Sequence, residues 1–164
     1  MDDSLSNFNS DYKNQMKIGN ISKVYKGLMK YLMNLRSHFL NKYPDEFSVG
    51  SFYQGYMDIS YFPLRPESLR RQKLKIGLVF NHEKFQFEIW LVGQNKKIQK
   101  DYWDWLKEKS WSKYKLSPSP QNSIIKEIIV KDPDFSDLDS LTEKIEIETL
   151  GFIKNILEIE ILEE

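Results

Sequence analysis

The chain has 164 residues, of which 40% are hydrophobic and 29% charged, so we expect a globular domain with a buried core. It contains no cysteine, which excludes disulfide bonds, thiolate nucleophiles and zinc sites built on thiolates. No apolar stretch approaches the ~20 residues that span a bilayer, and the polar, acidic start lacks the pattern of a secretory signal. We therefore expect a cytoplasmic protein without a membrane-spanning segment.

The net charge of zero hides an uneven distribution of charge along the chain. Residues 132–164 hold 11 acidic and 2 basic side chains, a net charge of −9, whereas residues 1–131 hold 13 acidic and 22 basic side chains, a net charge of +9. We interpret the acidic segment as an amphipathic helix that covers a basic sheet or a partner subunit, which leaves a homodimer open. A basic surface for nucleic acid has less support.

The predicted domain organisation is a loose N-terminal arm over residues 1–19, without periodicity, followed by a single α/β domain over residues 20–164. Apolar side chains at spacings of three and four predict a first helix that begins at Asn20, as its N-cap, and ends at Tyr43 before a proline.

Two segments of different composition follow this helix. Residues 49–62 are rich in aromatic and β-branched side chains, which predicts a strand with a bulge at Gly55. The next segment, FPLRPESLRRQK, contains two prolines and no period, which predicts a loop or one short helical turn.

Residues 74–92 predict a β-hairpin around which the chain is organised. A turn centred between His82 and Glu83 gives one wholly apolar face, formed by Leu74, Ile76, Leu78, Phe80, Phe85, Phe87, Ile89 and Leu91. In this register the opposite face pairs Gly77 with Glu88 and Lys75 with Trp90. That face is mixed in character, so we expect any functional site to lie there.

The rest of the chain predicts three more elements and a long connection. Asn95 is the expected cap of a helix that ends near Lys109, and a Pro/Ser-rich connection, interpreted as a mobile lid or a plain loop, leads to a buried strand over residues 124–130. A last helix begins near Asp137, although residues 156–162 also alternate as a strand would.

The order helix-strand-strand-strand-helix-strand-helix predicts an α+β fold, with a mixed sheet of about four strands and helices packed on it. This order is similar to the core of the restriction-endonuclease-like fold. The resemblance implies Mg²⁺ held by two carboxylates, here Asp58 (with Asp45 as an alternative) and Glu88. The family's lysine is replaced by Trp90, and Lys75 across the hairpin would take its place.

A second resemblance concerns the amino-acid sequence of the middle third of the chain. The segments YQGYMDISYF and LKIGLVFNHEKFQFEIWLVGQNK resemble a family of small bacterial proteins of uncharacterised function, over residues 28–106. This resemblance implies a bacterial origin and carries over no activity.

Two functions therefore stand as hypotheses. The first is a non-catalytic domain for ligand binding or protein interaction without a cofactor, on an aromatic and charged sheet face. Its binding residues would be Tyr53, Tyr56, Trp90, Arg70 and Arg71. The alternative is a metal-dependent phosphodiesterase or nuclease relative, with Asp58, Glu88 and Lys75 as catalytic residues and Mg²⁺ between the two carboxylates.

Overall fold

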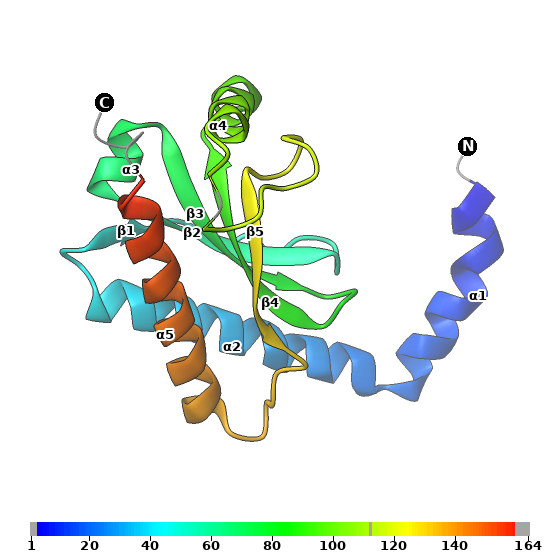
Figure 1. Cartoon of the computed structure of the whole chain (residues 1–164). Coiled ribbons are helices and arrows are strands. Elements are labelled where there is room, and N and C mark those ends of the chain that lie inside the picture. Colours follow the sequence, from blue (N-terminus) through cyan, green and yellow to red (C-terminus); the bar gives the residue numbers. More distant parts are fainter. Residues whose placement is uncertain (1–2, 112, 160–164) are drawn as a thin grey trace. The chain divides into compact units, whose positions relative to one another are not determined.

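The computed structural model describes residues 3–111 and 113–159 (Figure 1). The helices are α1 (Asp3–Ile18), α2 (Asn20–Lys42), α3 (Glu67–Arg71), α4 (Lys96–Glu108) and α5 (Leu138–Leu157). The strands are β1 (Phe47–Val49), β2 (Ile59–Pro66), β3 (Leu74–Asn81), β4 (Gln86–Gly93) and β5 (Ile125–Lys131). The α+β prediction is confirmed. Within the described ranges, no helix has the length and apolar character needed to cross a bilayer.

The chain divides into two compact units, with the boundary inside α2 between Leu35 and Arg36. In the first unit α1 meets α2 at Gly19, whose φ of +84° is a left-handed conformation that suits glycine. Because α1 runs from Asp3 to Ile18, the loose arm predicted for residues 1–19 is largely helical. From Phe8 onward the side chains of α1 are exposed, so no buried apolar stripe marks this helix in the sequence. The predicted helix from Asn20 is confirmed.

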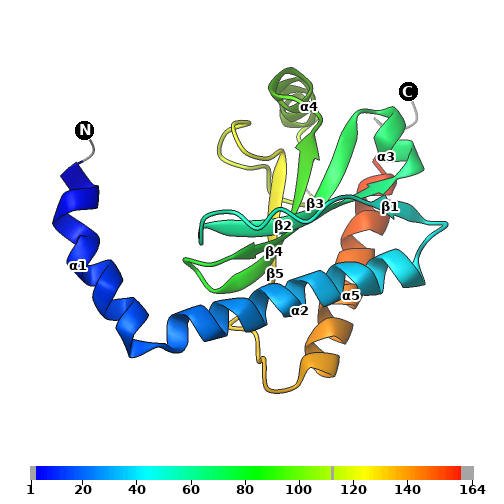
Figure 2. The same cartoon turned by 180° about the vertical axis from the view of Figure 1, so that it is seen from behind.

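The second unit contains one sheet of five strands in the order β1-β2-β3-β4-β5, and every neighbouring pair is antiparallel (Figures 1 and 2). The prediction of a mixed sheet was wrong in this respect. Ile125 at the start of β5 pairs with Leu91 near the end of β4, so the segment that contains α4 leaves the sheet and rejoins it at the same end. The last strand must then run antiparallel to β4.

The predicted strand over residues 49–62 divides into β1 and β2, with an irregular turn between them. Gly55 and Met57 both adopt left-handed backbone conformations, with φ of +75° and +63°. A Cβ on Gly55 would lie 2.0 Å from the carbonyl oxygen of Ile59, so only glycine fits this close approach. The turn lies after the end of β1 at Val49 and directly precedes β2, which starts at Ile59.

The hairpin of β3 and β4 forms as predicted, but its register differs by two residues. Asn81 pairs with Gln86, leaving a four-residue loop in which the side chain of Asn81 accepts a hydrogen bond from the Lys84 amide at 3.1 Å. Phe85 lies in the loop with φ of +52° and does not pair with Phe80. Because side chains alternate with a period of two, a shift of two residues leaves each one on its predicted face.

One face of the sheet is covered and forms the core. Phe39 at the end of α2 packs against Phe62 of β2, with ring centroids 6.2 Å apart, and Phe135 packs against Phe80 and Phe87. Helix α5 contacts β4 and β5. The buried side chains of this face come from β2, β3 and β4: Phe62, Leu64, Ile76, Leu78, Phe80, Phe87, Ile89 and Leu91. Burial of this apolar surface is the main stabilising contribution to the fold.

A group of polar side chains joins the end of α2 to α5 on the covered side. The carboxylate of Glu146 accepts a hydrogen bond from the Tyr43 hydroxyl and lies 2.9 Å from His38 Nε2 and 2.8 Å from Lys42 Nζ. Burial raises the pKa of Glu146, but the hydrogen bonds from Lys42, Tyr43 and His38 outweigh burial and lower its pKa to about 2. Glu146 thus remains ionised in an otherwise apolar layer.

Candidate functional site

The opposite face of the sheet carries an open pocket of about 560 Å³. Strands β2, β3 and β4 form its floor, and the start of α4 and the connection before β5 form its wall. The lining residues are Asp58, Ile59, Tyr61, Lys75, Gly77, Val79, Trp90, Val92, Gly93, Asn95, Lys96, Gln99, Gln121 and Asn122. This volume is in the range of small-molecule sites in proteins.

Trp90 is the largest side chain that lines the pocket, and its orientation is fixed from two sides. Its indole Nε1–H donates to Glu88 Oε1 at 2.9 Å, and the Lys126 ammonium lies 4.5 Å from the ring centroid. Glu88 is only 2% exposed, and its other oxygen accepts hydrogen bonds from Asn81 and Gln86 at 3.1 and 2.6 Å. Glu88 therefore positions the indole and does not itself line the pocket.

Gly77 leaves the floor of the pocket open beside the indole. It pairs directly with Trp90 across the hairpin, and a Cβ on Gly77 would meet only Val79 Cγ2, at an ordinary distance of 3.7 Å. The backbone there is extended, so the glycine is required neither by a turn nor by a close contact. The missing side chain is therefore best explained by the space that it leaves above the sheet.

Tyr61 of β2 provides a second aromatic side chain in the pocket. Its ring packs against that of Tyr53, with centroids 5.2 Å apart, and the two residues form a backbone bridge with hydrogen bonds of 2.7 and 2.9 Å. Tyr53, a predicted binding residue, thus packs beside Tyr61 and does not line the pocket.

Lys75 places a half-buried ammonium group in the pocket. Within the described residues its side chain forms no hydrogen bond or ion pair, in contrast to Lys97 and Lys100 of α4. Burial lowers the pKa of Lys75, and the nearby positive charge of Arg65 lowers it further. A cation held beside a like charge without a counter-ion favours the binding of an anion.

Asp58 lies at the other end of the pocket, in the turn that precedes β2. Its backbone carbonyl accepts a hydrogen bond from the amide of His82, which directly follows β3. Lys75 lies near the start of the same strand, so Asp58 and Lys75 are at opposite ends of β3. The backbone N–H groups of Tyr56 and Ile59 lower the pKa of the Asp58 carboxyl. The pocket therefore has a negative end at Asp58 and a positive end at Lys75.

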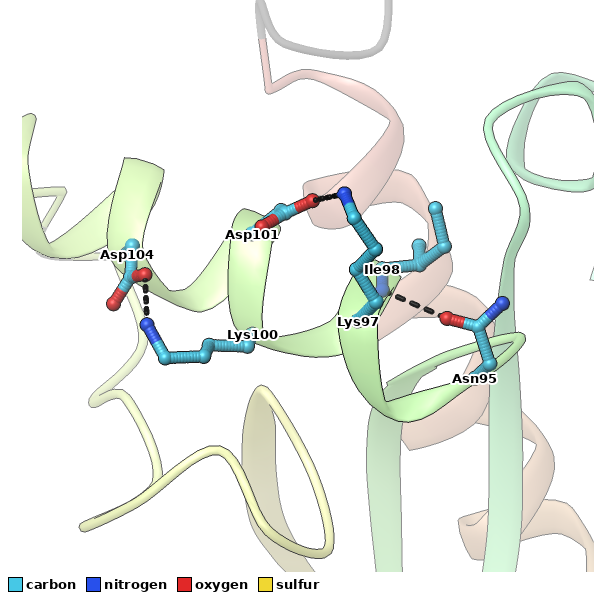
Figure 3. Close-up of polar contacts among 6 residues, drawn as sticks. All are labelled: Asn95, Lys97, Ile98, Lys100, Asp101 and Asp104. Carbon is cyan, nitrogen blue, oxygen red and sulfur yellow. Dashed lines mark hydrogen bonds and ion pairs between the residues drawn. The ribbon is translucent and has the colours of Figure 1, made fainter.

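The wall formed by α4 is fixed by local hydrogen bonds and ion pairs. Figure 3 shows the Asn95 side chain accepting a hydrogen bond from the Ile98 amide at 2.9 Å, which confirms the predicted N-cap. It also shows two ion pairs, of Lys97 with Asp101 and of Lys100 with Asp104. Lys96 is not part of these pairs and lines the pocket.

Gln99 connects α4 to both β4 and the connection before β5. A Cβ on Gly93 would lie 2.6 Å from the Gln99 backbone nitrogen, so the glycine allows helix and strand to approach. The Gln99 side chain accepts from the Gly93 amide at 3.1 Å and donates to the Pro120 carbonyl at 2.7 Å. Trp103 donates to the Ser117 carbonyl at 2.9 Å, so this part of the predicted lid is held against α4.

A smaller recess of about 190 Å³ shares Lys75 with the pocket. The other residues that line it are Arg65, Arg70, Lys73, Leu74 and Gln94. Arg70 forms an exposed ion pair with Glu67 at 3.0 Å. The recess lies at the end of the sheet where β3 begins, and its lining is predominantly basic.

The structure brings together some of the predicted site residues and separates others. Asp58, Lys75 and Trp90 line the pocket and Arg70 lines the recess, whereas Tyr56 and Arg71 are exposed and line neither. Among the described side chains, no three His, Asp or Glu form a group that could hold a metal ion. The polar wall was not predicted: Asn95, Lys96, Gln99, Gln121 and Asn122. Only the cap motif at Asn95 gave a signal for its position.

Comparison with known proteins bears on both resemblances expected from the sequence. A family model described as "Domain of unknown function (DUF7000)" matches residues 5–160. No curated protein and no solved structure matches the chain, so the resemblance to the restriction-endonuclease-like fold is not confirmed. The resemblance to a family of uncharacterised function is confirmed. The chain belongs to the DUF7000 family.

Proposed function

We propose that this protein is a non-catalytic binding domain, which holds a small molecule with a flat ring in the pocket on the open face of the sheet. The observation that carries the proposal is the pairing of Trp90 with Gly77 on the pocket floor. An aromatic side chain beside a glycine provides both a surface on which a ring can stack and the space that the ring would occupy.

Preorganisation of the pocket supports binding. Glu88 and Lys126 hold the Trp90 ring in one orientation, and Gln99 holds α4 and the connection before β5 in place. Little conformational freedom is then lost when a ligand binds, and that loss otherwise weakens association. The amides of Gln121 and Asn122 add donors and acceptors that could select among ring substituents.

The alternative, a metal-dependent phosphodiesterase built on Asp58, Glu88 and Lys75, has less support. Both Glu88 oxygens accept hydrogen bonds from neighbouring side chains, and Glu88 does not line the pocket that contains Asp58 and Lys75. A magnesium site would require free carboxylate oxygens from both acids.

The test is ligand-observed NMR with a panel of uncharged ring compounds: adenosine, guanosine, uridine and indole. We expect at least one to bind and to quench the fluorescence of Trp90, one of 4 tryptophans in the chain. Two variants address the pocket. Gly77→Val fills the space above the floor without backbone strain, and Trp90→Leu removes the stacking surface. Each should weaken binding about tenfold or more, because stacking on an aromatic ring contributes ~1–3 kcal/mol.

The matched control is Trp111→Phe, which alters a tryptophan that does not line the pocket. It should bind the ring compound as the unmodified protein does. The proposal is wrong if no compound binds, or if Gly77→Val binds as tightly as the unmodified protein while retaining the same thermal stability.

A further inference from the structure

The basic recess beside the pocket has no role in the function proposed so far. It is lined by Arg65, Arg70, Lys73 and Lys75, and within the described residues the only carboxylate paired with any of them is that of Glu67. Most basic clusters on proteins are solvated surface. This recess differs from such a cluster because it is concave and because one of its cations also lines the pocket.

Arg65 and Lys75 place two positive charges side by side on neighbouring strands. Leu64 of β2 pairs with Ile76 of β3, so the next position along the two strands brings Arg65 beside Lys75. Like charges that face each other across a sheet are destabilising. Both side chains are half-buried; burial lowers the pKa of Lys75, and the charge of Arg65 beside it lowers that pKa further.

The backbone holds a third cation at the same place. Lys73, the second residue after α3, adopts a left-handed conformation with φ of +62°, and its carbonyl accepts a hydrogen bond from the Gln94 amide at 2.8 Å. This conformation is uncommon for a residue with a side chain. The chain therefore turns sharply here, between the helix that carries Arg70 and the strand that carries Lys75.

We propose that this recess is a subsite for a phosphate group, and that the ligand is a phosphorylated ring compound of the nucleoside monophosphate class. The ligand class rests on the proposed function, since the ring would lie over Trp90 while the phosphate reaches past Lys75 towards Arg65 and Lys73. Guanidinium and ammonium groups bind phosphate through charge-assisted hydrogen bonds. The carboxylate of Asp58, at the far end, would accept a hydrogen bond from an amino group on the ring.

Calorimetric titration of the full chain with adenosine, AMP and inorganic phosphate separates the two subsites. AMP should bind at least tenfold more tightly than adenosine, and inorganic phosphate should compete with AMP but not with adenosine. Raising the salt concentration should weaken AMP binding more than adenosine binding, since it screens the charges.

Two variants address the recess directly. Lys75→Met and Arg65→Met should each reduce the affinity for AMP to near that for adenosine. Arg65→Met, which alters a residue of the recess that does not line the pocket, should leave adenosine binding within about twofold. The control is Lys131→Met, which removes the same charge from β5 and lines neither cavity. It should leave AMP binding unchanged. Thermal unfolding of each variant checks that the fold is retained.

The outcomes distinguish this inference from the proposed function. If adenosine binds and AMP binds no more tightly, or if Lys75→Met and Arg65→Met retain the full preference for AMP, the phosphate subsite is wrong and the ring pocket stands. If phosphate binds and depends on Arg65 and Lys75 while no ring compound binds, the subsite stands and the ring pocket is wrong. If nothing binds, both are wrong.

Discussion

The two faces of the sheet are built from the same strands and differ in almost every other respect. On the covered face, side chains such as Phe62, Leu78 and Ile89 are buried against α5 and the end of α2. On the open face, Gly77 leaves space, Lys75 remains without a counter-ion among the described residues, and the buried Glu88 accepts a hydrogen bond from the Trp90 indole. We expect the first arrangement to contribute stability and the second to reduce stability in exchange for a preformed cavity. Predictions can test this division of roles.

The largest effect is expected on the covered face. Phe62→Ala removes a ring that is 1% exposed and contacts Phe39, so it should reduce the free energy of unfolding by about 3–5 kcal/mol. Urea denaturation followed by circular dichroism measures this loss. A loss below about 1 kcal/mol would mean that this face is not the core.

A smaller effect on stability is expected at Glu146, the charged side chain between α2 and α5 on the covered side. Because the pKa of Glu146 is lowered to about 2 from an ordinary 4.5, its ionised form stabilises the fold above about pH 4.5, and that contribution disappears as the pH falls towards 2. Glu146→Gln should cost about 2 kcal/mol at pH 7 and little at pH 2. Urea denaturation at several pH values measures both. An unchanged pH dependence in the variant would contradict the ion-pair account.

The smallest effect, and one of opposite sign, is expected on the open face. Lys75→Met removes a half-buried cation beside Arg65, so it should leave the free energy of unfolding unchanged or raise it by less than about 1 kcal/mol. Thermal unfolding in buffer without phosphate measures the change. A clear loss of stability would show that Lys75 has a structural role and would weaken the contrast between the two faces.

Much of this contrast could be predicted from sequence, because alternation along a strand assigns side chains to faces without knowledge of the register. The apolar face of the hairpin and the position of Lys75, Gly77 and Trp90 on the other face follow from that rule. The exact residue pairs between β3 and β4 could not be predicted from the sequence, since they depend on the length of the loop. That loop is held by the hydrogen bond between the Asn81 side chain and the Lys84 amide.

Features that depend on tertiary contacts were beyond reach of the sequence. The polar wall exists because Gly93 lets Gln99 approach β4, and neither residue shows this in its local pattern. The resemblance to the restriction-endonuclease-like fold implied Glu88 as a metal ligand, but its hydrogen bonds to three side chains could not be predicted from spacing. Gly55 did indicate an irregularity, and the structure shows a complete turn there.

The two edges of the sheet have a consequence for behaviour at high concentration. An exposed edge strand can pair with the edge of another molecule and start aggregation. Here β1 has only three residues, and β5 carries Lys126 and Lys131, while a register shift interrupts its pairing with β4 and Leu116 bridges its first residue. Short length, charge and irregularity all discourage a second strand from adding. Lys126 thus has two effects. Its ammonium group lies over the Trp90 ring, and its charge disfavours pairing of β5 with the edge strand of another molecule.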